Sequence, residues 1–265
     1  MQRLFLNPKY ERVFAEQGWN TFSGVFEHFF PNYARRRKMT VQRITIPARD
    51  GDMDAFFKLY HHRESGWSFW MRASKARREF HNYAAFERLG LPAADRIACG
   101  EERNAFGILQ RAFIITRAVP DATELDDYFQ SKPPSAERRH ILRELAGIVR
   151  RLHSAHFYYC DLVWRNILVS NPPRVTPAKG SDAGPRLFLI DCPRGGFARF
   201  GRARKQLRDL ASLDKTAAHL CSRTERLRFL LAYLGQRRLD DEGRALVHAC
   251  LAYRRTRWPE DWRGK

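Results

Sequence analysis

Apolar and polar residues alternate along several stretches of the first half of the chain. Residues 40–47 and 55–60 each alternate as strands do, with turn-forming residues at 48–52 between them, so the two predict a hairpin. Residues 74–89 carry an apolar stripe at helical spacing, and Gly90 with Pro92 marks its end. Two further short strands are predicted, over 105–108 and 112–116. The first forty residues mix aromatic and charged side chains without clean periodicity.

The second half of the chain has a helical pattern. A connector over 119–123 precedes a long helix that is predicted from Ser135, its expected N-cap, to about His153. Short apolar strands at 167–169 and 187–190 flank a stretch rich in Pro, Gly and Ser, 171–185, which is expected to be a mobile loop. From about Lys205 onward the chain is predicted to be helical, most clearly over 224–234 and 241–253.

This order of elements predicts an α+β protein with two lobes. The expected boundary gives a β-rich N-terminal lobe of residues 1–118 and a larger helical C-terminal lobe of residues 119–265. No apolar run is long enough for a membrane-spanning helix, and the N-terminus does not have the pattern of a secretory signal. A cytosolic location is therefore expected.

The net charge of the chain indicates which kinds of partner it can attract. The chain has 48 Lys and Arg against 29 Asp and Glu, a formal net charge of +19. Such a charge attracts polyanions such as nucleic acid, phosphorylated saccharides or an anionic membrane surface, without choosing among them. Basic runs at 35–38 and 202–205 are, taken alone, more often solvated faces than binding sites. The five cysteines are scattered and form no C-x-x-C pair, which favours a packing role over a zinc or redox site.

Candidate chemistry lies where the long helix ends. Asp161 follows in a loop, Asn166 comes five residues later, and an apolar strand begins directly after it. This resembles the catalytic loop of protein kinases, H-x-D-x-x-x-x-N, in which the Asp reaches the acceptor hydroxyl and the Asn holds a metal on the phosphates. Asp191 ends the next apolar strand, at the position of the principal Mg²⁺ ligand in such folds.

The predicted N-terminal lobe contains a lysine in the position expected for binding the nucleotide phosphates. Lys58 lies within an apolar strand, where a charge is costly unless it is paired. Its expected partners are nucleotide phosphates and a helix glutamate, for which Glu79 is in the right helix. Each of these features alone is weak, but four of them in the right order and on the right elements indicate a kinase.

The chain resembles the bacterial lipopolysaccharide core kinases, which phosphorylate heptose or Kdo and belong to the protein-kinase-like superfamily. The resemblance runs from about Trp19 to Gly235 and rests on five stretches, at 56–60, 76–80 with 89–92, the catalytic loop, 208–213 and 225–235. It implies a protein-kinase-like fold, ATP and Mg²⁺ as cofactors, and a sugar hydroxyl on lipopolysaccharide as the acceptor. It also implies work at the cytoplasmic face of the inner membrane, with peripheral contact to its anionic surface.

Residue roles follow from the same resemblance. Lys58 would hold the α- and β-phosphates and Glu79 would orient it, while Asp161 would be the catalytic base and Asn166 and Asp191 would bind the metal. Asp209 would either brace the catalytic loop or be a simple acid at a helix N-terminus. The aromatic N-terminal stretch and residues 67–72 fit either a membrane surface or core packing.

The sequence departs from the kinase pattern in four places. Tyr159 stands where the motif has His, so the usual backbone contact must be replaced. Cys192 and Pro193 replace Phe-Gly after the metal-binding acid, which suggests a stiffer loop. No glycine-rich loop precedes Lys58, and only seventeen residues separate Asp191 from Asp209, which leaves little room for a peptide platform.

Two alternatives remain beside the lipopolysaccharide sugar kinase. One is a small-molecule phosphotransferase of the aminoglycoside or choline kinase type, against which the basic charge argues because cationic acceptors usually meet acidic pockets. The other is a pseudokinase that acts as a binding module, against which the retained motif residues argue. Nucleic-acid binding rests on charge alone and is not expected, and the protein is expected to be a monomer.

Overall fold

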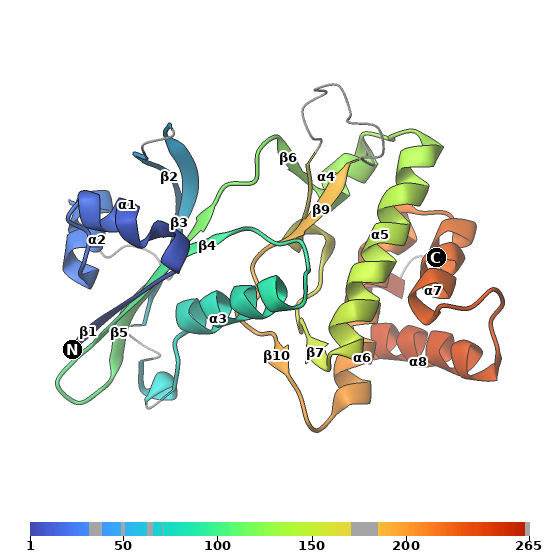
Figure 1. Ribbon diagram of the computed structural model, residues 1–265. Coiled ribbons are helices and arrows are strands. Elements are labelled where there is room, and N and C mark those ends of the chain that lie inside the picture. The colour runs from blue at the N-terminus through green and yellow to red at the C-terminus, as the bar shows by residue number, and fades with distance from the viewer. Residues whose placement is uncertain (32–38, 49–50, 63–65, 71, 171–184, 263–265) are drawn as a thin grey trace. The chain divides into compact units, whose positions relative to one another are not determined.

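The computed structural model describes residues 1–31, 39–48, 51–62, 66–70, 72–170 and 185–262 (Figure 1). The chain folds into two compact units, the first made of residues 1–86 and 94–118 and the second of residues 87–93 and 119–265. The expected mobile loop, the basic run at 35–38 and part of the turn at 48–52 lie outside the described residues.

A five-stranded antiparallel sheet is the centre of the first unit. Its strands follow the order β1-β4-β5-β3-β2. Strands β2 and β3 form the predicted hairpin, in register from Met39 opposite Tyr60 to Ile46 opposite Met53. The bounds of the five strands are β1 Gln2–Leu6, β2 Met39–Ile46, β3 Met53–His61, β4 Arg96–Arg103 and β5 Leu109–Arg117.

One face of this sheet is covered by aromatic side chains from the N-terminal segment. The short helices α1 (Glu11–Glu16) and α2 (Phe22–Phe29) bring Trp19, Phe22 and Phe26 onto it, all at most 4% exposed. They pack in one core with alternate residues of β3, among them Phe57 and Leu59. For these aromatics the core-packing interpretation is therefore correct. A 3-10 turn, η1 (Pro8–Tyr10), joins β1 to α1.

Helix α3 (Lys75–Arg88) packs against the other face, because the residues of β3 that alternate with Phe57 and Leu59 meet its side chains (Figure 1). A buried glutamate, Glu101, places the start of α3 by accepting a hydrogen bond from the backbone N–H of Ser74 at 2.7 Å. The Ser74 hydroxyl in turn accepts from Arg77 N at 3.0 Å and caps the helix. The turn η2 (Gly66–Phe69) precedes α3, and Trp67 and Trp70 beside it are 72% and 54% exposed, so the core-packing interpretation is wrong for these two.

Within the described residues, five helices make up most of the second unit. Helix α5 supplies the buried apolar face that the sequence predicts, including Ile141, Leu145 and Leu152. Helix α7 begins with a complete capping box, in which Ser222 and Glu225 exchange hydrogen bonds. The bounds are α4 Leu125–Gln130, α5 Ser135–Ser154, α6 Arg202–Leu220, α7 Arg223–Leu234 and α8 Asp241–Arg257, followed by the turn η4 (Pro259–Trp262).

Two small sheets position the loops of this unit. The first has the order β6-β8-β9, and in the second β10 pairs with β7. A short 3-10 turn, η3 (Trp164–Asn166), leads directly into β8. The strands are β6 Ala122–Glu124, β7 Phe157–Tyr158, β8 Ile167–Ser170, β9 Arg186–Leu189 and β10 Gly196–Phe197.

Two local predictions are wrong. Residues 105–108 form the turn between β4 and β5, because the Asn104 side chain accepts hydrogen bonds from the backbone of Phe106 and Ile108. Ser135 is not an N-cap, since α5 is preceded at the cap position by Pro134 and has no side-chain cap. Among the described residues, no helix is both long and apolar enough to cross a bilayer.

Candidate active site

The register of the β8–β9 hairpin brings two of the predicted site residues together. Ile167 lies opposite Leu189, and Ile190 N donates to Asn166 O at 3.0 Å. Asn166 therefore ends one side of the hairpin directly opposite the residue before Asp191. Asn166 is 6% exposed and Asp191 is half-buried. The backbone pairing therefore brings Asn166 and Asp191 to the same end of a small sheet.

Asp161 belongs to the same arrangement through the loop that precedes β8. The Asn166 side-chain amide donates to Asp161 O at 2.9 Å, and Val163 N donates to the same carbonyl at 2.9 Å. Asp161 is half-buried, and no side chain of the described residues pairs with its carboxylate in an ion pair. Asp161, Asn166 and Asp191 thus form one constellation within the second unit, as the motif spacing predicts.

A buried carboxylate braces this loop from α6. Asp209, which is fully buried, accepts from Tyr159 N at 2.8 Å and from Cys160 N at 2.7 Å. It lies in the middle of α6, beyond the first turn, so the interpretation as a helix N-terminal acid is wrong. The two hydrogen bonds hold the residues immediately before Asp161. Asp209 is therefore the bracing residue that the other interpretation describes.

His153 and Tyr233 complete the surroundings of Asp209. His153 Nε2 lies 3.4 Å from Asp209 Oδ2, and its Nδ1 lies 2.9 Å from the Tyr233 hydroxyl. Burial raises the pKa of Tyr233 to about 12, so the phenol keeps its proton at neutral pH. Neither partner belongs to the motif: His153 lies near the end of α5, eight residues before Asp161, and Tyr233 comes from α7, far away along the chain.

Tyr159 replaces the contact that the missing motif histidine would make. Its hydroxyl donates to Ile190 O, which links the catalytic loop to the residue before Asp191. The Cys192 thiol lies 4.0 Å from Tyr159 O on the other side of the same region. The Tyr159 side chain thus links the loop before Asp161 to the segment before Asp191, about thirty residues later in the chain, through a hydrogen bond to a backbone carbonyl.

Two residues of this region have a left-handed backbone. Cys160 has φ +64° and Asp191 has φ +58°, a region that non-glycine residues enter at a cost and that is frequent at functional sites. Burial, and then the nearby Asp209 carboxylate, raises the pKa of the Cys160 thiol above its usual range, so Cys160 remains protonated beside Asp161. A thiolate nucleophile is not favoured at this position.

Lys58 and Glu79 pair within the first unit. Lys58 Nζ, on β3, lies 3.4 Å from Glu79 Oε2, on α3, and the two side chains are 12% and 3% exposed. The Tyr60 hydroxyl donates to the same oxygen at 2.9 Å. Tyr60 was missed from sequence, although its spacing of two residues from Lys58 places it on the same face of a strand. The pair leaves Lys58 with its charge oriented by a fixed carboxylate.

The donor set suits Mg²⁺. Asn166 and Asp191 offer amide and carboxylate oxygens, the ligand type that Mg²⁺ takes. Within the described residues no three or more His, Cys, Asp or Glu side chains gather in a way that would hold a metal by themselves. A magnesium ion held by one or two protein side chains together with substrate phosphates and water matches that composition.

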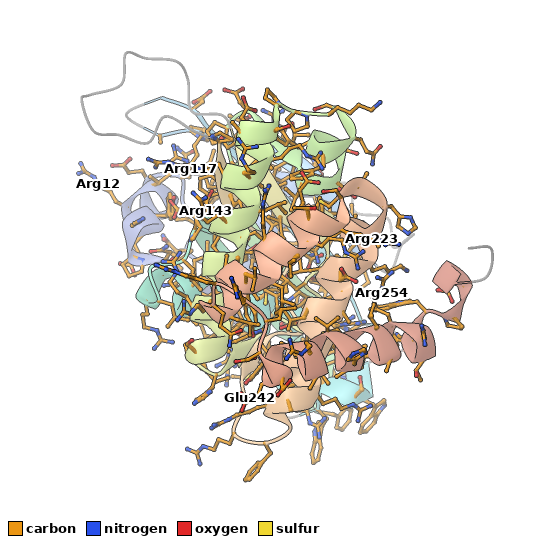
Figure 2. All side chains as sticks on the ribbon, turned by 90° about the vertical axis from the view of Figure 1, so that its right-hand side faces the viewer. Arg12, Arg117, Arg143, Arg223, Glu242 and Arg254 are labelled. Atoms are coloured by element: carbon orange, nitrogen blue, oxygen red, sulfur yellow. The ribbon has the colours of Figure 1, made fainter. Side chains whose placement is uncertain are left out.

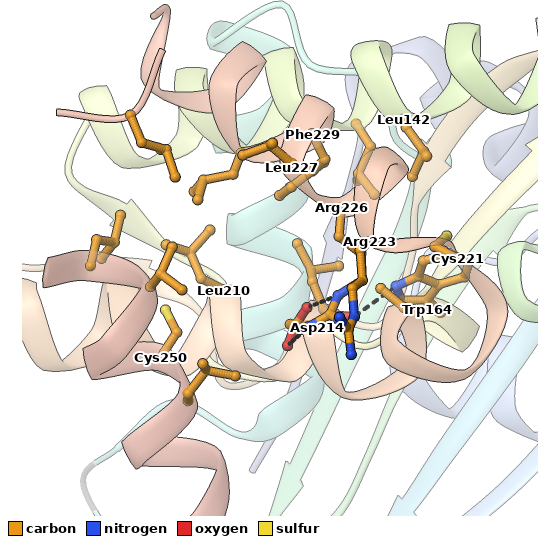
Figure 3. A pocket seen from close by; sticks show the side chains of 18 residues that line it. Leu142, Trp164, Leu210, Asp214, Cys221, Arg223, Arg226, Leu227, Phe229 and Cys250 are labelled. Carbon is orange, nitrogen blue, oxygen red and sulfur yellow. Dashed lines mark hydrogen bonds and ion pairs between the residues drawn. The ribbon is translucent and has the colours of Figure 1, made fainter. Parts of the chain in front are cut away.

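A separate apolar pocket opens among the helices of the second unit. It has a volume of about 260 Å³ and is lined mainly by leucines of α5, α6, α7 and α8 (Figure 3). At its wall Asp214 accepts from Arg226 at 2.7 and 2.9 Å and from Arg254 at 2.5 Å. Trp164 of η3 also lines it and donates to Leu213 O at 2.9 Å. Through Trp164 the pocket adjoins the catalytic loop.

The chain was compared with models of known protein families. The model of the lipopolysaccharide kinase (Kdo/WaaP) family matches residues 53–233, which include Lys58, Glu79, Asp161, Asn166 and Asp191. The chain belongs to this family. The family match confirms the resemblance seen in the sequence.

Individual relatives are more distant. Two 3-deoxy-D-manno-octulosonic acid kinases are each 25% identical to the chain, one from Haemophilus influenzae over 118 residues and one from Vibrio cholerae over 127 residues. Each match covers 44% of this chain, and 44% and 52% of the two relatives, so it spans about half their length.

A solved structure of WaaP in complex with acyl carrier protein superimposes with a TM-score of 0.68 at 21% identity. The superposition covers 98% of this chain and 99% of that one. It shows a shared fold, and the predicted α+β, protein-kinase-like fold of this family member is confirmed.

Proposed function

We propose that this member of the Kdo/WaaP family is an ATP-dependent kinase that transfers the γ-phosphate to a hydroxyl of an inner-core sugar, heptose or Kdo, of lipopolysaccharide. The observation that carries the proposal is the constellation of Asp161, Asn166 and Asp191, set by the β8–β9 register on a loop that Asp209 braces. Family membership supports a sugar of the lipopolysaccharide core as the acceptor.

Each residue then has a role that its surroundings allow. Asp161 accepts the proton of the acceptor hydroxyl, since its carboxylate is half-buried at the end of the braced loop. Asn166 and Asp191 hold the metal with their side-chain oxygens. Lys58, oriented by Glu79, binds the nucleotide phosphates. Bound Mg-ATP supplies the phosphoryl group and neutralises the charge that develops on it.

The segment after Asp191 supports a small acceptor over a protein. Only seventeen residues separate Asp191 from Asp209, and the structure uses them for β10 and the start of α6. No long platform for a peptide is left there. The basic charge favours an anionic saccharide over the cationic acceptors of a small-molecule phosphotransferase.

The direct test is phosphorylation of dephosphorylated core saccharide by the purified protein with Mg-ATP, followed by mass analysis of the sugar. We expect a phosphosugar with the wild-type chain and none with Asp161→Ala. Asp241→Ala, at a carboxylate 96% exposed on α8, is the matched control and should retain full turnover. Unchanged turnover in Asp161→Ala would refute the assignment of the base, and absence of any Mg-ATP-dependent thermal shift would favour a pseudokinase.

We further propose that the enzyme works at the cytoplasmic face of the inner membrane as a monomer, in peripheral contact with anionic lipid. The net charge of +19 supports this contact. Figure 2 shows many of the cationic side chains on the second unit, with Arg143 and Arg223 projecting from the helices, whereas Arg254 is buried and paired with Asp214. Sedimentation velocity of the purified chain, with and without anionic vesicles, distinguishes a membrane-bound monomer from a dimer.

Acyl carrier protein is a second candidate partner, because a relative of the same fold was solved in complex with one. A basic chain suits an acidic carrier, and the apolar pocket of about 260 Å³ has the lining to take an acyl chain. We expect co-expressed acyl carrier protein to co-purify with the wild-type chain. Ala217→Phe, which fills the pocket, should abolish this, whereas retention by that variant would exclude the pocket as the acyl site.

A further inference from the structure

The segment between the proposed metal ligand Asp191 and helix α6 exposes an unusual set of side chains. Phe197 and Phe200 are 58% and 87% exposed. Four arginines of the same segment are exposed as well. We call these six residues the Phe/Arg rim: Arg194, Phe197, Arg199, Phe200, Arg202 and Arg204.

The composition of the rim is strongly one-sided. From Cys192 to Arg208 the chain has six basic residues and no acidic one. Phe197 packs edge-on against Phe157 but remains 58% exposed, and Phe200 is 87% exposed, so the two form an apolar patch of the kind that marks an interaction site. Aromatic residues interleaved with arginines are the composition of segments that lie in the headgroup region of a bilayer.

The rim is held in place by backbone contacts. Strand β10 pairs with β7, Gly196 opposite Tyr158 and Phe197 opposite Phe157, and Ala198 N donates to His156 O at 2.9 Å. Arg202 Nε donates to Ala198 O at 3.1 Å. Along the chain, Phe200 lies between the anchors at Ala198 and Arg202, and Arg204 follows in the first turn of α6. The rim is therefore a preformed surface.

Its position ties it to the catalytic loop. Strand β7 ends at Tyr158, and Tyr159, which follows directly, belongs to the loop braced by Asp209. Strand β10 begins five residues after Asp191. The rim is thus continuous, through one strand pair, with the residues proposed to carry out phosphoryl transfer.

We propose that the Phe/Arg rim docks this enzyme onto an anionic lipid surface. The phenylalanines enter the headgroup region and the arginines bind lipid phosphates, so that an acceptor sugar anchored in the same bilayer is presented beside Asp161. The benefit for an anchored acceptor rests on the proposed function, whereas the docking itself does not. The binding experiment needs neither ATP nor acceptor, so its failure is separate from failure of the kinase assignment.

The test compares two triple variants in co-sedimentation with phosphatidylglycerol-containing vesicles. The rim variant is Arg199→Ser with Phe200→Ser and Arg204→Ser, three positions whose side chains make no hydrogen bond or ion pair within the described residues. The matched control is Phe106→Ser with Arg237→Ser and Arg238→Ser, which removes a phenylalanine that is 77% exposed, against 87% for Phe200, and two exposed arginines elsewhere. Both lose the same charge.

We expect the rim variant to lose at least about twenty-fold in vesicle partitioning, since each basic residue near an anionic surface contributes about fivefold. The control should lose much less, and pure phosphatidylcholine vesicles should bind all three proteins weakly. Equal losses in the two variants would show that net charge alone attracts the chain and would overturn the proposal. Loss of binding only in Trp67→Ser with Trp70→Ser would assign the contact to the first unit instead.

Steady-state kinetics of the rim variant test the same proposal independently of vesicle binding. With acceptor embedded in vesicles, the rim variant should show a raised KM, while kcat with a water-soluble de-acylated core saccharide should stay at the wild-type value. If turnover on the soluble acceptor falls as far as on the embedded one, the rim is part of the acceptor site and not a lipid contact. Loss of acyl carrier protein binding with unchanged vesicle binding would assign the rim to an acidic protein partner.

Discussion

The proposed site residues of the two units are held in different ways. In the second unit, side chains bond to backbone: Asp209 accepts from two N–H groups, and Tyr159 and Asn166 donate to carbonyls. In the first unit, Lys58 and Glu79 meet as two side chains at 3.4 Å. The loop that carries Asp161 is thus fixed by hydrogen bonds to its own backbone. Lys58, in contrast, is oriented by one side-chain carboxylate, and its ammonium group can bind nucleotide phosphates as well.

Because the two kinds of contact differ, their loss should affect the stability of the fold and the binding of nucleotide to different degrees. A backbone N–H that loses its buried acceptor is left unsatisfied, which costs the full desolvation of that group. A lysine that loses its carboxylate can still turn toward water or phosphate. Loss of the buried Asp209 brace should therefore act first on folding, and loss of the Glu79 carboxylate should act on nucleotide affinity as well as on stability.

The largest effect is expected for Asp209→Ala. The change leaves Tyr159 N and Cys160 N without their buried acceptor, which should lower the free energy of unfolding by about 3–5 kcal/mol. Urea denaturation followed by circular dichroism measures it. Asp52→Ala, at an exposed aspartate, should change stability by less than about 0.5 kcal/mol. A loss below 1 kcal/mol in Asp209→Ala would mean that the brace is not structural.

An ion pair between two side chains of the second unit gives a second comparison, because its contribution to stability should depend on pH. Arg138 donates to Glu225 at 2.7 and 3.1 Å, and this hydrogen bonding lowers the pKa of Glu225 to about 2. A lowered pKa gives stability that is present above the unfolded value of about 4.5 and is lost as pH falls toward 2. Glu225→Gln should cost about 1.5–3 kcal/mol at pH 7.

That cost should shrink by more than half at pH 3, which lies below the unfolded pKa of about 4.5 and above the folded pKa of about 2. At that pH the carboxylate is mostly protonated in the unfolded chain and still mostly ionised in the folded one, so most of its contribution to stability is gone, and the variant has no such contribution to lose. Denaturation midpoints of both proteins at the two pH values give the answer. A difference that does not depend on pH would assign the effect to the capping box of α7, in which the same side chain bonds to Ser222.

An intermediate effect on stability is expected for Glu79→Gln. The amide can still accept from Tyr60, so the loss should be about 1–2 kcal/mol, the difference between a charged and a neutral acceptor. Lys58 loses its orienting charge, and the apparent KM for ATP should rise about tenfold. Initial rates at varied ATP measure this. A fall in kcat at unchanged KM would place Glu79 in the chemical step.

The smallest loss of stability is expected for Tyr159→Phe, which removes one hydrogen bond to Ile190 O and costs about 1 kcal/mol. Because that bond holds the residue before Asp191, kcat should fall about tenfold while the fold is kept. Tyr253→Phe, on helix α8, serves as the control. Wild-type kcat in Tyr159→Phe would show that the β8–β9 register alone positions Asp191.

The sequence predicts the constellation well because short-range spacing decides it. Asp161 and Asn166 share one loop, and the apolar strand before Asp191 pairs with the strand after Asn166. Lys58 and Glu79 were predictable as partners because a cation in an apolar strand requires a counter-charge. In contrast, His153 and Tyr233 around Asp209 are set by helix packing, which leaves no local pattern.

Strands β1 and β4 were not predicted from sequence, for a related reason. β4 contains a glycine and several charges, and its buried Glu101 reads as a surface residue until Ser74 and Arg103 are seen beside it. The predicted strand at 105–108 failed because Asn104 and Gly107, whose φ is +75°, make a turn that its apolar residues conceal.

The close packing behind Asp191 has a consequence for control of the enzyme. A Cβ at position 195 would lie 2.4 Å from the Cys192 thiol and 3.1 Å from Tyr158 O, so this segment fits only with glycine there. Tight packing at this glycine disfavours a second arrangement of the segment. Under the proposed function, we therefore expect a kinase without an in/out switch after Asp191, whose output is set by when and where it meets its acceptor.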